Sequence, residues 1–326
     1  MDEFTIKYFK HFYKFRNKEI KFNFIKEEKN KIKGKLKKIN YKIIPYEIPE
    51  NKIKKLIDTE WVYSEVINQL DNLNVNFKIT WYYKTTHNIY IKCKKEKYIG
   101  FCKRLHILLN MINYLYDLKK YEENKPINMY LVLTPLKKNL DIESVIGPKN
   151  INSGYTDFIV NEIFVWREEE FEKVIFHELI HYMDLDVRNM AFDDKDLPHN
   201  INGYKSYFEA FTDFWGIVYH LIYVSIVLNK SVNSLFQIEF KFMENQANLI
   251  NDFFRLDNWD DKKEINQKSP AFTYFIIKYM LFNEILNSNN MLLLDNPREL
   301  MLIVLSKGFK TKRFLRLPPR MTLIQL

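Results

Sequence analysis

The spacing of apolar residues alternates along the chain between a helical period and a strand period. In residues 51–70 the apolar positions fall on one helical face, and helical spacing returns in residues 101–121. Between these segments apolar residues alternate with others in residues 75–83 and again in residues 89–93, which predicts a β-hairpin. A further short strand is predicted at Asn128–Thr134, where a proline follows it.

The second half of the chain is expected to be mostly helical. Residues Asp157–Trp166 predict one more strand, which runs directly into the acidic run Arg167-Glu168-Glu169-Glu170. Because acidic side chains stabilise the first turn of a helix, we expect a helix to begin at this run. The later segments are helical by pattern, and they are Tyr204–Leu228, Val232–Asn251 and Ser269–Leu286.

Positive charge is concentrated at the N-terminal end. Residues 1–50 hold 14 Lys and Arg against 7 Asp and Glu, so they carry +7 of the formal net charge of +9. The segment includes the lysine-rich run Lys29–Lys38. Such a run is usually a solvated face, and the alternative is contact with nucleic acid, an acidic partner or an acidic membrane.

Composition narrows the class of protein. Hydrophobic residues make up 47% of 326 residues, which is enough for a real core, and only 7 Gly and 10 Pro argue against a low-complexity or collagen-like chain. Cys93 and Cys102 are the two cysteines, so no disulfide framework is implied and a reducing compartment is expected. No secretory signal is seen at the N-terminus, and the apolar run Ile217–Leu228 is too short to span a bilayer. We therefore expect a soluble, cytoplasmic protein.

A metal-binding pattern lies on the helix expected after the acidic run. Residues 177–181 read His-Glu-Leu-Ile-His, the H-E-x-x-H pattern. On a helix, His177 and His181 project from one face at a spacing that suits a shared Zn²⁺, and Glu178 lies beside them. The alternative is that these are ordinary core or surface histidines. The apolar residues around the motif favour the metal interpretation, with one zinc ion per chain.

A catalytic zinc site generally needs a third protein ligand and an open position for water. An H-x-x-G-x-x-H extension of the motif is absent, because Asp184 and Val187 stand at its glycine and histidine places. The possible third ligands are acidic residues and histidines further along the chain: Asp184, Asp186, Asp193, Asp194, Asp196, His199, Glu209 and His220. We favour Glu209, because Asp213 falls one helical turn beyond it and can orient a ligand histidine through the other ring nitrogen.

These two motifs resemble the gluzincin clan of zinc metallopeptidases, which pairs H-E-x-x-H with a downstream E-x-x-x-D motif on a second helix. The resemblance covers residues 157–216, and the step of 28 residues from His181 to Glu209 differs from the best-known members. It implies an α+β, zincin-like fold: a small mixed sheet, an active-site helix and a mainly helical C-terminal half, with the substrate cleft between them. Asp157–Trp166 would then be the edge strand that pairs with the substrate backbone; the alternative is an ordinary interior strand.

The resemblance also suggests how the chain is divided. We expect a basic N-terminal segment (1–50), a subdomain with the sheet and the H-E-x-x-H helix (51–186), a helical subdomain with the third zinc ligand (187–290) and a C-terminal extension (291–326). Lys, Asn, Ile, Phe and Tyr are abundant, which suits an A/T-rich genome, and the resemblance does not cover residues 1–50 and 230–326. In both respects the chain is similar to metallopeptidase-like proteins of large DNA viruses. A location inside a virion or host cell is the corresponding expectation.

The mechanism implied by the motif is hydrolysis of peptide bonds by zinc-bound water. Glu178 would act as the base that accepts a proton from this water. The oxyanion needs a donor besides zinc, and Tyr204, Tyr207 or His220 can supply it. We favour Tyr204, because some gluzincins place a tyrosine shortly before the glutamate ligand. Tyr207 and His220 are possible cleft residues, although His220 also fits a core histidine.

Two further classes of function remain open. One is a catalytically silent, zinc-binding interaction protein that uses its basic residues 1–50 to contact nucleic acid or an acidic partner. The other is metal-dependent hydrolysis of a bond other than a peptide bond, since activation of water is not specific to peptides. The retained glutamate of the motif favours an active enzyme, with a protein or peptide as its substrate.

Overall fold

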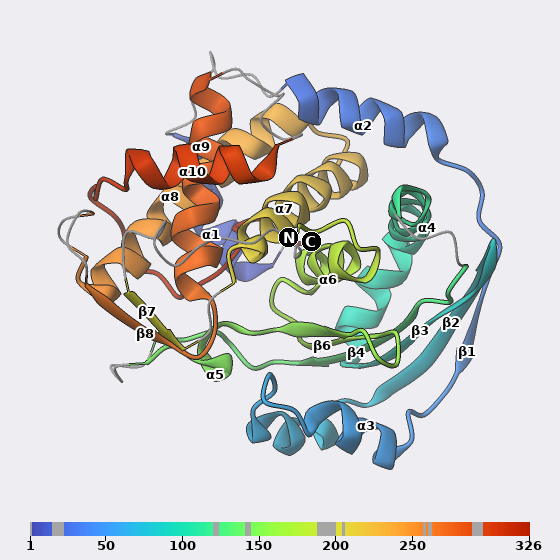
Figure 1. Cartoon of the computed structure of the whole chain (residues 1–326). Helices are drawn as coiled ribbons and strands as arrows, with labels where there is room; N and C mark the ends of the chain where they lie inside the picture. Colours follow the sequence, from blue (N-terminus) through green and yellow to red (C-terminus); the bar gives the residue numbers. More distant parts are fainter. Residues whose placement is uncertain are drawn as a thin grey trace.

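A mixed β-sheet organises the first half of the chain. The computed structural model describes residues 2–14, 23–119, 124–140, 145–187, 200–203, 206–256, 259, 263–288 and 296–326. The strands of the main sheet are β1 (Tyr41–Pro45), β2 (Val75–Tyr83), β3 (Thr85–Cys93), β4 (Asn128–Thr134), β5 (Gly154–Asp157) and β6 (Glu162–Arg167). They lie in the order β1-β2-β3-β4-β6-β5, as Figure 1 shows. The pairs β3-β4 and β4-β6 are parallel, and the other pairs are antiparallel.

The hairpin and the strand predicted at 128–134 are confirmed. In β2 the alternate residues Phe77, Ile79 and Trp81 are buried, as the period of two requires. Strand β4 is buried on both faces, because its side chains alternate between two core clusters on opposite sides of the sheet.

Helices cover the sheet and build the second half. They are α1 (Glu3–Tyr13), α2 (Asn23–Lys35), α3 (Glu50–Ile57), η1 (Ser64–Asn72), α4 (Lys95–Leu118), α5 (Pro148–Ile151), α6 (Phe171–Tyr182), α7 (Phe208–Val227), α8 (Val232–Phe254), η3 (Phe272–Ile277), α9 (Lys278–Ser288) and α10 (Pro297–Lys307). Helices α4 and α6 lie on one face of the sheet, and α3 lies on the other (Figure 1). The α+β class and the mainly helical second half are thus confirmed.

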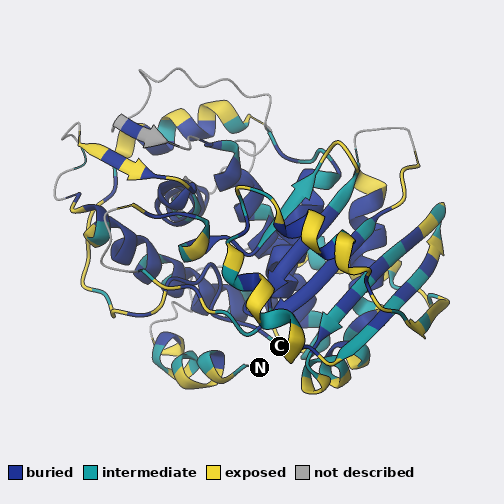
Figure 2. Ribbon diagram, turned by 90° about the horizontal axis from the view of Figure 1, so that it is seen from below, coloured by how far each residue is buried: buried dark blue, intermediate teal, exposed yellow. Residues whose placement is uncertain are grey.

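The division into subdomains stays a prediction. One core cluster includes Phe12 of α1, Ile112 of α4, Phe214 of α7 and Ile324 near the C-terminus. Figure 2 shows buried positions on the sheet strands as well as on the helices of the second half. A small second sheet pairs β7 (Asn200–Gly203) with β8 (Glu264–Gln267) in parallel.

The basic N-terminal segment is packed into this core. Helix α2 buries Ile25 and Ile32, and the ammonium group of Lys29 lies 2.5 Å from the hydroxyl of Ser225 on α7. Other lysines of the run, such as Lys31 and Lys33, are exposed. One face of α2 is therefore structural and the other is solvated. Contact of residues 1–50 with nucleic acid or an acidic partner stays a prediction.

Among the described residues, α7 is one helix long and apolar enough to cross a membrane, judged by length and composition. In the 18-residue window that passes this test, 83% of the residues are buried inside the protein. A core helix of a folded domain gives the same signal, so this helix is weak support for a membrane span.

The strand expected at Asp157–Trp166 is wrong in its extent. The segment turns at residues 158–161, so that Asp157 ends β5 while β6 returns antiparallel to it. Asn161 allows the turn by adopting a left-handed backbone conformation, with φ of 54°. β6 is an interior strand between β4 and β5, and the edge of the sheet on this side is β5.

The helix also begins later than expected, at Phe171 rather than at the acidic run. Glu169 and Glu170 are buried and bind distant groups instead of facing solvent in a first turn. Glu170 accepts hydrogen bonds from the ammonium group of Lys138 (2.5 Å) and from the backbone N–H of Thr322 (2.6 Å). The acidic run therefore connects the start of α6 to distant segments of the same chain through hydrogen bonds and ion pairs.

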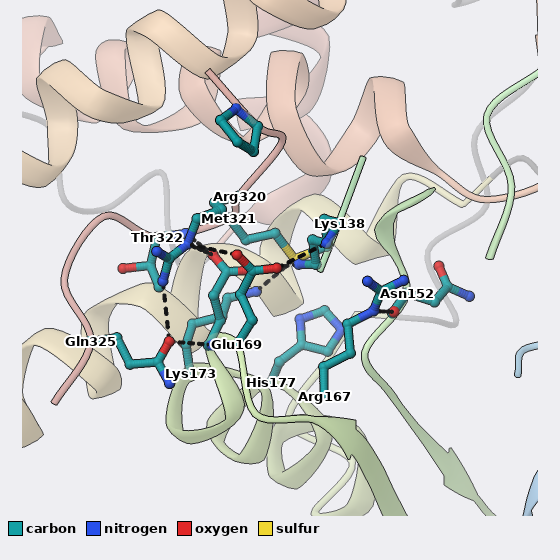
Figure 3. A network of polar contacts seen from close by, with 12 residues as sticks. Lys138, Asn152, Arg167, Glu169, Lys173, His177, Arg320, Met321, Thr322 and Gln325 are labelled. Carbon is teal, nitrogen blue, oxygen red and sulfur yellow. Dashed lines mark hydrogen bonds and ion pairs between the residues drawn. The ribbon is translucent and has the colours of Figure 1, made fainter. Parts of the chain in front are cut away.

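The C-terminal tail is the main partner of this acidic run. Figure 3 shows Arg320, Thr322 and Gln325 gathered around Glu169 at the start of α6. Arg320 is buried and lies 3.5 Å from Glu169 and 3.8 Å from Glu170. The tail thus lies directly beside the helix that carries the H-E-x-x-H motif.

Candidate metal centre

Two packed helices bring the motif residues together. Helix α6 carries His177, Glu178 and His181, and α7 carries Glu209 at its first turn. Gly216 of α7 lies against α6, where an added Cβ would be only 3.4 Å from the Cα of His177. The absence of a side chain at this glycine lets the two helices approach closely.

The ligand atoms of His177, His181 and Glu209 converge on one point. The two Nε2 atoms are 3.2 Å apart, and Glu209 Oε2 lies 3.2 Å from His177 Nε2 and 3.3 Å from His181 Nε2. All three side chains are buried. The described chain thus contains a buried His-His-Glu group that can bind a metal ion.

A carboxylate orients each histidine from behind. Nδ1 of His177 lies 3.0 Å from Asp213, and Nδ1 of His181 lies 2.6 Å from Asp186. An ionised carboxylate only accepts hydrogen bonds, so each Nδ1 carries a proton and Nε2 of each ring is the atom that would bind a metal.

Two buried lysines hold Asp213 in turn. Lys173 of α6 and Lys278 of α9 both form ion pairs with its carboxylate, the second at 2.6 Å. Burial lowers the pKa of Lys278 to about 8 and that of Lys173 well below its ordinary value. In Figure 3, Lys173 and His177 follow one another along the same helix.

The pKa values of the three converging groups shift in different directions. Burial lowers the pKa of His177 to about 3. Burial acts in the same direction on His181, but Glu209 and Asp186 outweigh it and raise the pKa to about 10. The pKa of Glu209 falls below its ordinary value, because the two histidines outweigh the effect of burial.

Glu178 faces the same space from beside the ligands. Its Oε2 accepts a hydrogen bond of 2.9 Å from the hydroxyl of Thr156 on β5. Burial raises the pKa of Glu178 to about 7. A Cβ on Gly154, also on β5, would lie 2.6 Å from Val174 and 3.1 Å from the carboxylate of Glu178, so the glycine lets this strand reach the helix.

A cavity of about 330 Å³ opens onto these groups. Its polar wall includes His177, His181, Glu178 and Glu209, and β5 contributes its whole length except Asp157. The rest is largely apolar and aromatic: Trp61, Tyr155, Phe158, Phe208, Pro270, Tyr274 and Met321. A ligand in this cavity would contact the metal-binding group and an apolar wall at the same time.

The other predicted residues lie in different places. Tyr204 and, among the possible third ligands, Asp193, Asp194, Asp196 and His199 lie outside the described residues. The cavity wall contains Phe208 rather than Tyr207, whose side chain is buried in the apolar core. Asp186 lies behind His181 as its hydrogen-bond partner.

Of the two interpretations of His220, the core histidine is confirmed and the position in the cleft is wrong. The side chain is fully buried, and its Nε2 donates a hydrogen bond of 2.6 Å to the carbonyl of Ile324 in the C-terminal tail. This contact turns the ring towards the tail, which explains why a position on the same helical stripe as Asp213 does not reach the cavity. His220 is a core histidine.

This histidine should make the stability of the fold depend on pH. Burial lowers its pKa from 6.5 to about 4, so protons bind the unfolded chain first and destabilise the fold as the pH falls from 6.5 to 4. A pKa difference of this size corresponds to about 3 kcal/mol. Urea unfolding of the wild type and His220→Gln should show the wild type losing about this much relative to the variant between pH 7 and 4. A constant difference across this range would contradict the assignment.

Sequence patterns missed several residues around the centre. Lys173 stands four residues before His177, so helical spacing alone puts it on the same stripe. Thr156, Lys278 and Tyr274 come from other elements, and no local signal connects them to the motif. Tyr274 lines the cavity with its ring centroid 5.7 Å from that of His177, edge to face.

Comparisons with known proteins give one partial relative. The chain is 26% identical over 148 residues to a protein of Acanthamoeba polyphaga mimivirus named uncharacterized protein R210. The matched stretch covers 40% of this chain and 38% of that protein. No protein family model matches the chain, and no solved structure matches it. This similarity does not assign the chain to a family.

Proposed function

We propose that this protein is a zinc-dependent peptidase of the gluzincin type with a zincin-like fold. One observation carries the proposal: His177, His181 and Glu209 present three ligand atoms to one point, and a second carboxylate, that of Glu178, faces the same cavity. Three protein ligands beside a cavity leave a position for water, which is typical of catalytic rather than structural zinc sites.

The spacing of the ligand atoms supports zinc. Nitrogen and oxygen ligands lie at roughly 2.0–2.1 Å from tetrahedral zinc, which places two such atoms about 3.4 Å apart. The three separations observed are 3.2, 3.2 and 3.3 Å. A set of two imidazoles and one carboxylate is also a common catalytic zinc set.

Each side chain around the centre has a chemical role in this proposal. Zinc bound there would make water more acidic and polarise a carbonyl group. Glu178 would accept the proton of the attacking water, and Thr156 would keep its carboxylate in place. Asp213 and Asp186 would hold the two imidazoles in the orientation that binds the metal.

The substrate would be an extended peptide lying along β5. This strand is the outermost of the main sheet on its side, and Gly154, Tyr155 and Thr156 line the cavity. A peptide could add to such an edge by backbone hydrogen bonds. For the oxyanion donor, Tyr204 stays a prediction and Tyr274 is a second possibility from the cavity wall.

Metal analysis tests the third ligand. Purified protein should hold one zinc ion per chain and hydrolyse denatured protein, and a strong chelator should stop the hydrolysis. Glu209→Ala should hold zinc more than about 100-fold more weakly, because loss even of the outer partners of a ligand costs 10–100-fold in affinity. Glu96→Ala, at an exposed position of α4, is the matched control and should keep its zinc. Full zinc content in Glu209→Ala would overturn the ligand set.

A further inference from the structure

Three consecutive large apolar residues are exposed at one turn of the protein. Phe158, Ile159 and Val160 join β5 to β6 with 51%, 92% and 40% of their surfaces exposed. Elsewhere in the described chain, exposed large apolar residues occur singly along the sequence. Single exposed apolar residues need no explanation, whereas a contiguous apolar patch indicates a binding surface. We refer to residues 158–160 as the apolar turn.

The apolar turn is held in one conformation. The side-chain oxygen of Asp157 accepts hydrogen bonds from the backbone N–H groups of Ile159 (2.9 Å) and Val160 (3.2 Å). The strands on either side pair with each other directly. A surface ordered in advance loses less entropy when a partner binds, so this turn is suited to recognition.

The apolar turn is continuous with the candidate metal centre. The ring of Phe158 stands edge to face against the ring of His181, with centroids 6.4 Å apart, and Phe158 lines the cavity. Trp61, Phe208 and Pro270 extend the apolar surface inside the same cavity. A substrate peptide that lies along β5 would have its scissile bond near Glu178. The side chains next to that bond would therefore contact the apolar turn and the apolar residues of the cavity wall.

We propose that the apolar turn and the aromatic wall bind bulky apolar side chains next to the scissile bond. The inference rests on the proposed peptidase function and adds the class of substrate: an extended, apolar polypeptide segment. Apolar contacts favour association in proportion to the apolar area removed from water. Ile159 is 92% exposed, so a bound side chain can remove most of its surface from water. Such segments are buried in folded proteins, so unfolded or flexible chains are the substrates that present them.

Cleavage preference tests the proposal. Digestion of a denatured protein mixture, with mass spectrometric sequencing of the new termini, should show leucine, isoleucine, phenylalanine or methionine beside most cleaved bonds. Two synthetic peptides that differ only by leucine or serine at that position should differ in kcat/KM by roughly tenfold or more. Ile159→Ser should reduce this ratio to about twofold, mainly through KM. Ile99→Ser, at a residue of α4 that is 50% exposed, should leave the ratio unchanged.

Binding without cleavage separates this inference from the proposed function. With zinc-loaded Glu178→Gln, fluorescence anisotropy should show the leucine peptide binding roughly tenfold more tightly than the serine peptide, and Ile159→Ser should remove the difference. Selective binding without any hydrolysis by the wild type would reject the peptidase and support the apolar site. Hydrolysis with equal rates for both peptides would reject the apolar site and support the peptidase. Binding of the protein to lipid vesicles through the apolar turn, with no preference between the two peptides, would also overturn the proposal of an apolar substrate site.

Discussion

Replacement of Glu178 by glutamine should lower kcat by about 10²–10⁴-fold, the usual contribution of a general base. Glutamine has the same shape and can still accept the hydrogen bond from Thr156, but it cannot take a proton from water. The three ligand atoms belong to other side chains, so zinc should stay bound. The measurement is steady-state hydrolysis of a fluorogenic peptide, beside zinc content for the same sample.

The matched control for this variant is Glu96→Gln, which makes the same chemical change at an exposed position of α4 and should retain activity. If Glu178→Gln cleaved at the wild-type rate with full zinc, the base would be another group. If this variant lost its zinc, Glu178 would also contribute to metal binding.

The parts of the site that could be predicted are those set by helical periodicity. His177 and His181 are four residues apart, and so are Glu209 and Asp213. In the structure both histidines and Glu209 converge on one point, and Asp213 contacts Nδ1 of His177. A helix fixes this relation locally, whatever the rest of the fold does. The strand period in β2 has the same local character, which explains why this strand matches its predicted bounds.

The parts that could not be predicted depend on contacts between distant residues. Phe158, Ile159 and Val160 have high strand propensity, yet the hydrogen bonds of Asp157 and the left-handed Asn161 make them a turn. The sequence predicts that Glu170 lies in the first turn of a helix. In the structure it precedes the helix and accepts hydrogen bonds from Lys138 and Thr322, which are distant in the sequence. Asp186 and Asp184 are equally plausible partners for His181 until the loop after α6 is folded.

Asp213 and Asp186 each hold one of the two histidines of the candidate metal centre. Each accepts a hydrogen bond from Nδ1 of one ligand histidine, so Asp213→Asn and Asp186→Asn should each weaken zinc binding by about 10–100-fold. Competition with a chromophoric chelator measures this loss. Zinc binding unchanged by both substitutions would contradict the role given to these carboxylates.

Asp213→Asn should also lower the stability of the fold. Asp213 forms ion pairs with Lys173 and Lys278, both of which are buried. Removing one partner of a buried ion pair costs about 3–5 kcal/mol, because the remaining charge is left without compensation. In urea unfolding of chelator-treated protein, Asp213→Asn should therefore lose about 3–5 kcal/mol relative to the wild type. An unchanged free energy of unfolding would mean that other groups compensate the two lysines, and that Asp213 serves the histidine alone.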